Sequence, residues 1–225
     1  MELHEDADIM NLFFDLDGTL LDSHERLYKL FQALVPQSTF SFSAYWDLKR
    51  FKNDHKSILS KFFGFNDKGI KNFEKLWMSE IEDDRWLLLD KPFPGVTDYL
   101  MTLKDKGCML YLATSRQFKD KVVKQIIDFQ WESIFTGIYV TEQKFSKSEI
   151  LSGFRFTQNC WLIGDTGYDI LEGKKLNFTT VGIYSGFLAK EKLEEYNPDY
   201  LYEKVTEFMP DPAINNNSNE DERKI

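Results

Sequence analysis

Hydrophobic residues follow two patterns that alternate along most of this chain. Runs that are apolar throughout are typical of strands buried on both faces of a parallel sheet, whereas apolar residues at every third or fourth position are typical of amphipathic helices. The continuous runs predict strands at residues 9–15, 108–114, 135–140, 160–164, 179–184 and 199–202. Helical spacing occurs at residues 96–103, 118–129, 146–154, 170–176 and 188–196. We therefore expect an α/β fold with a doubly wound parallel sheet, which is a Rossmann-like core.

Residues 22–90 interrupt this alternation, because they contain helical patterns and no strand pattern. Asp22 and Glu25 have the spacing of a capping box at a helix start, as do Ser146 and Glu149 further along. Three more helical faces are centred on Tyr45, Trp46 and Leu48, on Ile58, Leu59, Phe62 and Phe63, and on Phe73, Leu76, Trp77 and Ile81. The sequence thus predicts an all-helical domain at 22–90, inserted into a core made of residues 1–21 and 91–210, with a disordered polar tail at 211–225.

The composition excludes several classes of protein. The chain has 225 residues, of which 42% are hydrophobic, and this is enough for a packed core. A net charge of −9 argues against a nucleic-acid partner, and no apolar run is long enough to cross a membrane. The acidic N-terminal segment lacks the pattern of a secretion signal, and the two cysteines, Cys108 and Cys160, predict buried thiols in a reducing compartment. We expect a soluble cytoplasmic protein, and the sequence fits a monomer and a homodimer equally well.

Two aspartates stand where the first predicted strand ends. Asp15 and Asp17 are two positions apart, so their carboxylates leave the strand on the same face. Gly18 then permits a sharp turn in which backbone N–H groups can face an anion. Two adjacent carboxylates repel each other unless a cation lies between them or one is protonated. The pattern fits a bound Mg²⁺ with one carboxylate free to attack, although Asp and Gly are also ordinary turn residues.

Other polar residues follow the later strands. Because ligands bind outside the carboxyl ends of the strands in an open parallel sheet, these residues should converge at one edge. They are Thr114 and Ser115, the lysines Lys144 and Lys147, and Asp165 and Asp169. Lys147 lies in the first turn of a predicted helix, where the helix dipole disfavours a cation, and this favours a functional role for Lys147 over Lys144.

Together these residue types supply what phosphoryl transfer requires. Asp15 can attack phosphorus and form an aspartyl-phosphate, and Asp17 can protonate the leaving oxygen and then activate water. The charge of the transferred group must be neutralised by a metal ion, a lysine and N–H or O–H donors. We therefore predict a Mg²⁺ site that includes Asp15 and Asp165, beside a phosphate site that includes Thr114 and Lys147. Asp169 can either bind a metal-bound water or cap its helix.

Four motifs of this chain resemble those of the haloacid dehalogenase-like hydrolases. Asp15-Leu-Asp-Gly-Thr19 resembles the first motif, Leu112-Ala-Thr114-Ser115 the second, Lys147 the third and Gly164-Asp165-Thr-Gly-Tyr-Asp169 the fourth. The resemblance extends over residues 9 to 205 and is strongest to the phosphoglycolate phosphatase-like branch, whose members carry a helical cap between the first two motifs. The chain departs from the pattern at Ser115-Arg116, where many relatives have Asn-Lys.

The resemblance implies a Mg²⁺-dependent phosphatase that hydrolyses a small phosphorylated metabolite through an aspartyl-phosphate on Asp15. Asp17 would be the acid and base and would also reach the metal through its backbone carbonyl. Asp165 would be a metal ligand. Asp169 would either bind the metal directly or contact the groups that bind it. The implied phosphate site consists of Gly18, Thr114, Ser115 and Lys147. The carboxylate at position 17 argues against a dehalogenase, while a sugar-phosphate mutase of the same fold and a non-catalytic binding protein are the alternatives.

A basic run at residues 49–56 stands out in this acidic chain. On one helix, Lys49, Lys52 and Lys56 would share a face. One hypothesis is that some of these lysines, or Arg50, contact a second anionic group of the substrate, and we select Arg50 and Lys52 as candidates. The alternative is a solvated basic face with no ligand.

Overall fold

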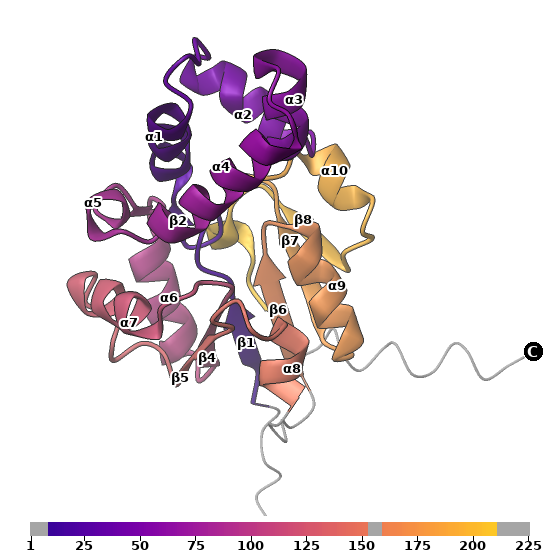
Figure 1. Cartoon of the computed structure of the whole chain (residues 1–225). Coiled ribbons are helices and arrows are strands. Elements are labelled where there is room, and N and C mark those ends of the chain that lie inside the picture. The colour runs from indigo at the N-terminus through magenta and orange to yellow at the C-terminus, as the bar shows by residue number, and fades with distance from the viewer. Residues whose placement is uncertain (1–8, 153–158, 211–225) are drawn as a thin grey trace, which may run out of the picture.

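Six parallel strands form the sheet at the centre of the computed structural model, which describes residues 9–152 and 159–210 (Figure 1). In sheet order they are β5 (Gly137–Val140), β4 (Met109–Thr114), β1 (Asn11–Phe14), β6 (Cys160–Gly164), β7 (Thr179–Ile183) and β8 (Tyr200–Tyr202). β1 pairs with both β4 and β6, so that Phe13 lies between Tyr111 and Leu162. The predicted doubly wound parallel sheet is confirmed, and each strand lies within a predicted strand segment.

Hydrophobic side chains of the central strands point alternately to the two faces of the sheet. Leu12 and Phe14 belong to a large cluster that includes helices α6 (Val96–Asp105) and α7 (Lys119–Asp128). Phe13 packs on the opposite face, in a cluster that includes α8 (Lys147–Ser152). Helix α9 (Gly167–Lys175) lies on this second face, where Gly173 adjoins Leu162. Helices lie on both faces of the sheet (Figure 1), and this accounts for the consecutive buried apolar residues of the central strands.

An all-helical cap lies between β1 and β4 in the chain and above the carboxyl ends of the strands (Figure 1). Its helices are α1 (His24–Leu34), α2 (Phe42–Arg50), α3 (His55–Phe63), α4 (Asp67–Glu80) and the single turn α5 (Asp84–Leu87). The cap has a hydrophobic core of its own, in which Phe31 of α1 meets Tyr45, Ile58 and Phe73 of the next three helices. A cap with its own core can keep its shape independently of the sheet beneath it.

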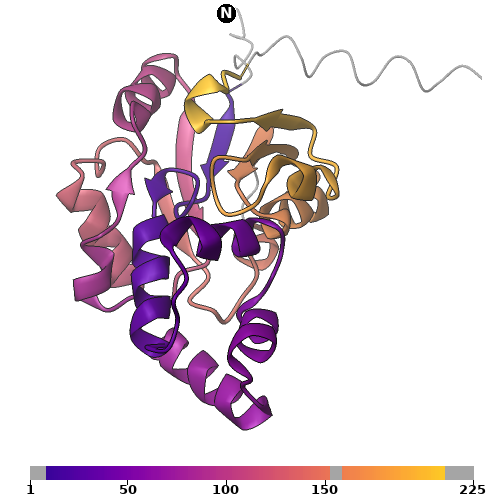
Figure 2. The same cartoon turned by 90° about the horizontal axis from the view of Figure 1, so that it is seen from above.

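The two segments that join the cap to the core lie side by side. β2 (Leu21–Asp22) and β3 (Lys91–Pro92) pair antiparallel where the chain enters and leaves the cap. Near the end of the chain are α10 (Lys190–Glu194) and the 3₁₀ turn η1 (Val205–Glu207). The segment that holds α10 lies beside the end of α2, and the Ala189 N–H donates to the Arg50 carbonyl at 3.0 Å (Figure 2). The paired strands and the segment beside α2 therefore both hold the cap to the core.

Several local predictions can be compared with the structure. The capping box at Ser146 and Glu149 is confirmed, because each residue's backbone N–H donates to the side chain of the other. The capping box at Asp22 and Glu25 is wrong: Asp22 lies in β2, and Ser23 stands at the N-cap of α1 without a side-chain cap bond. The predicted end of the helix at 146–154 and the predicted tail at 211–225 lie outside the described residues.

The basic run does not form one helix, which corrects the predicted shared face of its three lysines. α2 ends at Arg50, Lys52 adopts the left-handed conformation with φ of 64°, and Asp54 begins α3 by accepting from the Ser57 N–H.

None of the helices in the described ranges combines the length and the apolar composition needed to cross a membrane.

Candidate active site

The first candidate residue, Asp15, stands at the end of β1 beneath the cap. Its N–H donates to the carbonyl of Ile163 in β6 at 2.8 Å, which fixes its backbone at the sheet edge. The Nζ of Lys147, at the start of α8, lies 2.5 Å from Asp15 Oδ1. Lys144, by contrast, is exposed and pairs with Glu142. Of the two lysines that the sequence offered, the structure therefore brings Lys147 to Asp15.

Three buried carboxylates surround this lysine. Asp15, Asp165 and Asp169 each offer an oxygen atom within 4.8 Å of the others. The Lys147 ammonium, 1% exposed, also lies 2.6 Å from Asp169 Oδ1, so one positive charge faces three carboxyl groups. Burial raises the pKa of Asp15 to about 7, because the attraction of Lys147 only partly offsets it. Burial and the two neighbouring carboxylates also raise the pKa of Asp165 well above its ordinary value.

The three clustered carboxyl groups are suited to bind a Mg²⁺ ion. Mg²⁺ prefers oxygen ligands and is commonly bound by one or two carboxylates together with phosphate oxygens and water. The cluster of Asp15, Asp165 and Asp169 has only oxygen donors and more negative charge than Lys147 neutralises. A divalent cation would supply the missing positive charge. The side chain of Asp17 is not part of this cluster.

Two glycines leave the space that the Asp165 carboxylate occupies. A Cβ atom on Gly18 would lie 2.2 Å from Asp165 Oδ2, and one on Gly186 would lie 2.4 Å from the same oxygen. The carboxylate also accepts from the Phe187 N–H at 2.7 Å and from Thr19 Oγ1 at 3.3 Å. The N–H of Gly18, which the sequence suggested for phosphate binding, donates to the Leu21 carbonyl at 2.8 Å. In this structure Gly18 therefore provides clearance for Asp165.

Asp169 caps its helix, which is one of its two predicted roles, and it also contacts Lys147. With Thr166 it forms a capping box at the start of α9, in which Oδ2 accepts from the Thr166 N–H at 3.1 Å and from the hydroxyl at 2.6 Å. Its other oxygen, Oδ1, accepts from Lys147. Both oxygens thus already have protein partners, and Asp169 holds Lys147 in place from the α9 side.

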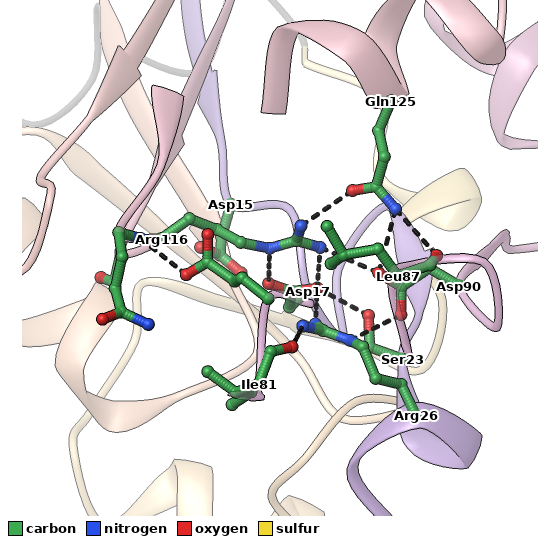
Figure 3. A network of polar contacts seen from close by, with 12 residues as sticks. Asp15, Asp17, Ser23, Arg26, Ile81, Leu87, Asp90, Arg116 and Gln125 are labelled. Atoms are coloured by element: carbon green, nitrogen blue, oxygen red, sulfur yellow. Dashed lines mark hydrogen bonds and ion pairs between the residues drawn. The ribbon is translucent and has the colours of Figure 1, made fainter. Parts of the chain in front are cut away.

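Asp17 lies in a second network, which is drawn in Figure 3. Arg116 contacts both of its oxygens at 2.6 Å, Arg26 of the cap contacts Oδ1 at 2.5 Å, and the Ser23 hydroxyl donates to Oδ1 at 2.6 Å. Both arginines also reach Asp90, at 2.8 and 2.9 Å. Burial alone would raise the pKa of Asp17, but attraction to the two guanidinium groups outweighs it and holds the pKa well below its usual range. Asp17 is therefore ionised here.

Little in the sequence indicates this second network. Arg116 was visible as a departure from the resembled second motif, but nothing marked Arg26 or Asp90. Arg26 lies on α1 and Asp90 lies just before β3, so they meet only because the entry and exit of the cap are adjacent. A pairing of this kind leaves no local spacing pattern.

A cavity of about 640 Å³ separates the cap from the carboxyl ends of the strands. Its core side includes Asp15, Asp17, Thr114, Ser115, Lys147 and Asp169, whereas its cap side includes Tyr45, Trp46, Lys49, His55 and Trp77. The predicted site residues from three different strand ends therefore face one cavity, as expected for a small-molecule site.

The two predicted cap residues take different positions. Arg50 does not line the cavity, since its Nη2 donates to the Tyr184 carbonyl at 2.8 Å. Lys52 reaches the cavity edge, but it forms an ion pair with Glu195 and lies 4.2 Å from the centre of the Tyr196 ring. Both side chains therefore join the cap to the segment around α10.

Comparison with known proteins places this chain in a family. Residues 12–183 match the sequence profile described as haloacid dehalogenase-like hydrolase, which is more than half of the chain. The chain belongs to the haloacid dehalogenase-like hydrolases. The predicted family is thereby confirmed, and so is the prediction that the chain is an enzyme of the hydrolase class.

Known members of the haloacid dehalogenase-like hydrolases match nearly the whole chain. The pyrophosphatase PpaX of Listeria welshimeri is 23% identical over 216 residues, which span 89% of this chain and 95% of the relative. A haloacid dehalogenase-like hydrolase of Streptococcus pneumoniae has a solved structure with a TM-score of 0.72 and 22% identity, covering 89% of this chain and 96% of that one. The solved structure of a predicted phosphoglycolate phosphatase from Haemophilus somnus has a TM-score of 0.66 and 16% sequence identity. The match covers 90% of this chain and 97% of that one. These neighbours agree with the predicted fold.

Replacing Gly18 with alanine is expected to destabilise the protein more than the same change at Gly107. Both glycines have positive φ, 85° and 84°, so both changes carry a similar backbone strain of about 1 kcal/mol. Only the Cβ at position 18 meets Asp165, because nothing lies within 4 Å of a Cβ at position 107. The clash should add about 1–3 kcal/mol. Urea unfolding of both variants measures the difference, and equal losses would contradict this account of Gly18.

Mg²⁺ is expected to stabilise the protein more at about pH 8 than at about pH 5.5. Burial raises the pKa of folded Asp15 from 3.8 to about 7, so between these values the folded state binds more protons than the unfolded state. The free energy of unfolding therefore falls as the pH rises towards 7, and a cation on the ionised carboxylates offsets this loss. The measurement is the midpoint of thermal unfolding with and without Mg²⁺.

Two variants serve as controls for this experiment. Asp165→Asn should lose most of the Mg²⁺-dependent shift, whereas Asp105→Asn, an exposed residue at the end of α6, should keep it. The same Mg²⁺ shift at both pH values in the unmodified protein would show that the buried carboxylates do not govern it.

Proposed function

We propose that this hydrolase is a Mg²⁺-dependent phosphatase that releases phosphate from a small phosphorylated metabolite through an aspartyl-phosphate on Asp15. The observation that carries the proposal is the pairing of Asp15 with Lys147 inside a cluster of three buried carboxylates, at the floor of the cavity between cap and core. Nucleophile, cation and metal-ligand oxygens thus lie together where a phosphoryl group would enter. The relatives named above as a pyrophosphatase and a phosphoglycolate phosphatase support a phosphate-releasing reaction.

Asp15 is oriented for attack on phosphorus. Its Oδ1 accepts from Lys147, and within the described residues its Oδ2 accepts no hydrogen bond. Oδ2 is therefore free to form the bond to phosphorus while Oδ1 keeps the carboxylate in one orientation.

The transferred phosphoryl group would lie between Lys147, Thr114 and the backbone around Ser115. Thr114 ends β4 and is buried, and it lines the same cavity as Lys147. The Ser115 carbonyl accepts from Gln143 Nε2 at 2.5 Å, which fixes the loop that follows Thr114. When bound by the carboxylates of Asp15 and Asp165, Mg²⁺ supplies further neutralisation of the phosphoryl charge. The resulting site holds positive charge and O–H donors around the oxygens where negative charge develops.

Asp17 is the residue that we assign to proton exchange. It lines the cavity beside Asp15, and its carboxylate is ionised in the present arrangement with Arg116 and Arg26. As an ionised group it can accept a proton from the water that attacks the phosphorylated Asp15. To protonate a leaving oxygen, Asp17 must first loosen at least one of its contacts with the two arginines, because these contacts favour its charged form.

Asp15→Asn is expected to lower kcat for phosphate release by about 10³-fold or more, because the amide cannot form the aspartyl-phosphate. The assay measures free phosphate from an aryl phosphate and from a panel of phosphorylated metabolites, with and without Mg²⁺. Asp105→Asn is the matched control and should retain full activity. Absence of phosphate release from every substrate with Mg²⁺, or unchanged turnover in Asp15→Asn, would overturn the proposal. An isomerised product with little free phosphate would instead indicate a mutase.

Lys147→Met should lower kcat/KM by about 10²-fold or more, whereas Lys144→Met should change it less than about twofold. The two lysines lie three residues apart, but only Lys147 reaches Asp15 and the cavity. Steady-state kinetics on the best substrate of the panel measures both effects. A larger loss in Lys144→Met would reverse our choice between the two lysines.

A further inference from the structure

The cations that line the cavity differ in whether the protein neutralises them. Four of the five are paired with carboxylates: Arg26 and Arg116 with Asp17 and Asp90, Lys147 with Asp15 and Asp169, and Lys52 with Glu195. The fifth is Lys49 of α2, whose side-chain ammonium has no ion pair and no hydrogen bond to any other residue in the described ranges. Lys49 is therefore the cavity cation whose charge is available to a ligand.

The surroundings of Lys49 make this free charge unfavourable without a ligand. Burial lowers the pKa of Lys49 to about 8, and the attraction of Asp54 offsets this only in part. Asp54 is engaged elsewhere, since its Oδ1 accepts from the Ser57 N–H at 2.7 Å and caps α3. A half-buried ammonium without a counter-ion costs free energy that a bound anion would recover.

The neighbouring histidine does not provide a second positive charge. His55 Nε2 is bonded to the Tyr45 hydroxyl at 2.9 Å, and its ring packs against Trp77 at a centroid distance of 4.2 Å. Burial and the nearby Lys49 hold the pKa of His55 well below its ordinary value, so the imidazole is neutral. The positive charge on this part of the cap therefore comes from Lys49.

The shape of the cavity places this charge away from the proposed reaction centre. Lys49 lines the cap side, together with the aromatic rings of Trp46 and Trp77, whereas Asp15 and Lys147 line the core side. A volume of about 640 Å³ fits a small metabolite whose phosphoryl group lies on Asp15 and whose other end points to the cap. Because the protein carries a net charge of −9, an acidic group at that end needs a local cation.

We propose that Lys49 binds a second acidic group on the leaving half of the substrate. The substrate class is then a small phosphate ester or phosphoanhydride whose leaving group itself carries a carboxylate or a phosphate. This inference rests on the proposed function and adds the kind of substrate to it. It also replaces the predicted candidates Arg50 and Lys52, which join the cap to the core.

The test compares Lys49→Met with Lys56→Met on three substrates. Lys56 is an exposed cap lysine outside the cavity and is the matched control. 2-Phosphoglycolate carries a carboxylate on its leaving group, pyrophosphate carries a phosphate there, and ethyl phosphate carries no second acid. Each substrate is compared with itself between variants, so differences in chemical reactivity cancel.

In Lys49→Met, kcat/KM should fall about 10- to 100-fold more for at least one acid-bearing substrate than for ethyl phosphate. A larger fall in kcat/KM for 2-phosphoglycolate identifies the second acid as a carboxylate, and a larger fall for pyrophosphate identifies it as a phosphate. Lys49→Arg, which keeps the charge, should recover much of the loss, and Lys56→Met should not discriminate between the substrates. Equal losses on all three substrates, or no loss, would show that Lys49 does not bind a second acid.

A binding measurement separates this inference from the proposed function. Calorimetry compares the Asp15→Asn chain with the Asp15→Asn, Lys49→Met chain, using 2-phosphoglycolate, pyrophosphate and ethyl phosphate as titrants. Affinity for an acid-bearing compound should be at least about tenfold lower in the double variant, with a smaller change for ethyl phosphate. That result without any phosphate release by the unmodified enzyme would contradict the phosphatase but retain the acid-binding site. Phosphate release by the unmodified enzyme, together with equal affinities in the single and the double variant, would support the phosphatase but contradict the acid-binding site.

Discussion

The charge balance around Lys147 is the interaction on which the candidate site depends. One buried ammonium holds Asp15 of the β1 end and Asp169 of the α9 start, while Asp165 of the β6 end completes the cluster. Lys147 offsets part of the effect by which burial raises the pKa of Asp15 and Asp165, and without the carboxylates a buried lysine would lose its proton. Three elements of the core are thus fixed to one another by a single side chain. The negative charge that Lys147 leaves uncompensated is the physical basis of the proposed Mg²⁺ site.

A second charged group joins the cap to this core. Two arginines and two aspartates, Arg26, Arg116, Asp17 and Asp90, form a buried arrangement whose charges cancel (Figure 3). Arg26 belongs to the first cap helix and Asp90 to the segment that leaves the cap, so a displacement of the cap changes the partners of Asp17. Removing one partner from a buried pair leaves an uncompensated charge, which is costly. The position of the cap and the protonation chemistry of Asp17 are therefore physically connected.

Much of the fold and part of the site could be predicted because they depend on local pattern and chain direction. Consecutive apolar residues predicted the central strands, and a parallel sheet brings the carboxyl ends of its strands to one edge. The structure accordingly places Asp15, Thr114, Lys147 and Asp165 around one cavity floor or directly beneath it. Two predictions were wrong for local reasons. Asp22 forms a strand pair and its carboxylate accepts from the His24 N–H without a capping box to Glu25. The basic run is broken by the turn at Lys52.

The sequence by itself determined the order of strands and helices, the insertion of a helical cap and the acidic motif at the first strand end, because each has a periodic or short-range pattern. The tertiary structure alone decided which charges meet. Arg26 and Asp90 are 64 residues apart and Arg116 and Asp17 are 99 residues apart, and their contacts form only when the cap folds back on the sheet. The same folding pairs Lys52 with Glu195, and it leaves the Lys49 ammonium facing the cavity without an ion pair to any residue that the structure describes. Long-range ion pairs of this kind depend on packing in three dimensions, which the spacing of residues along the chain does not encode.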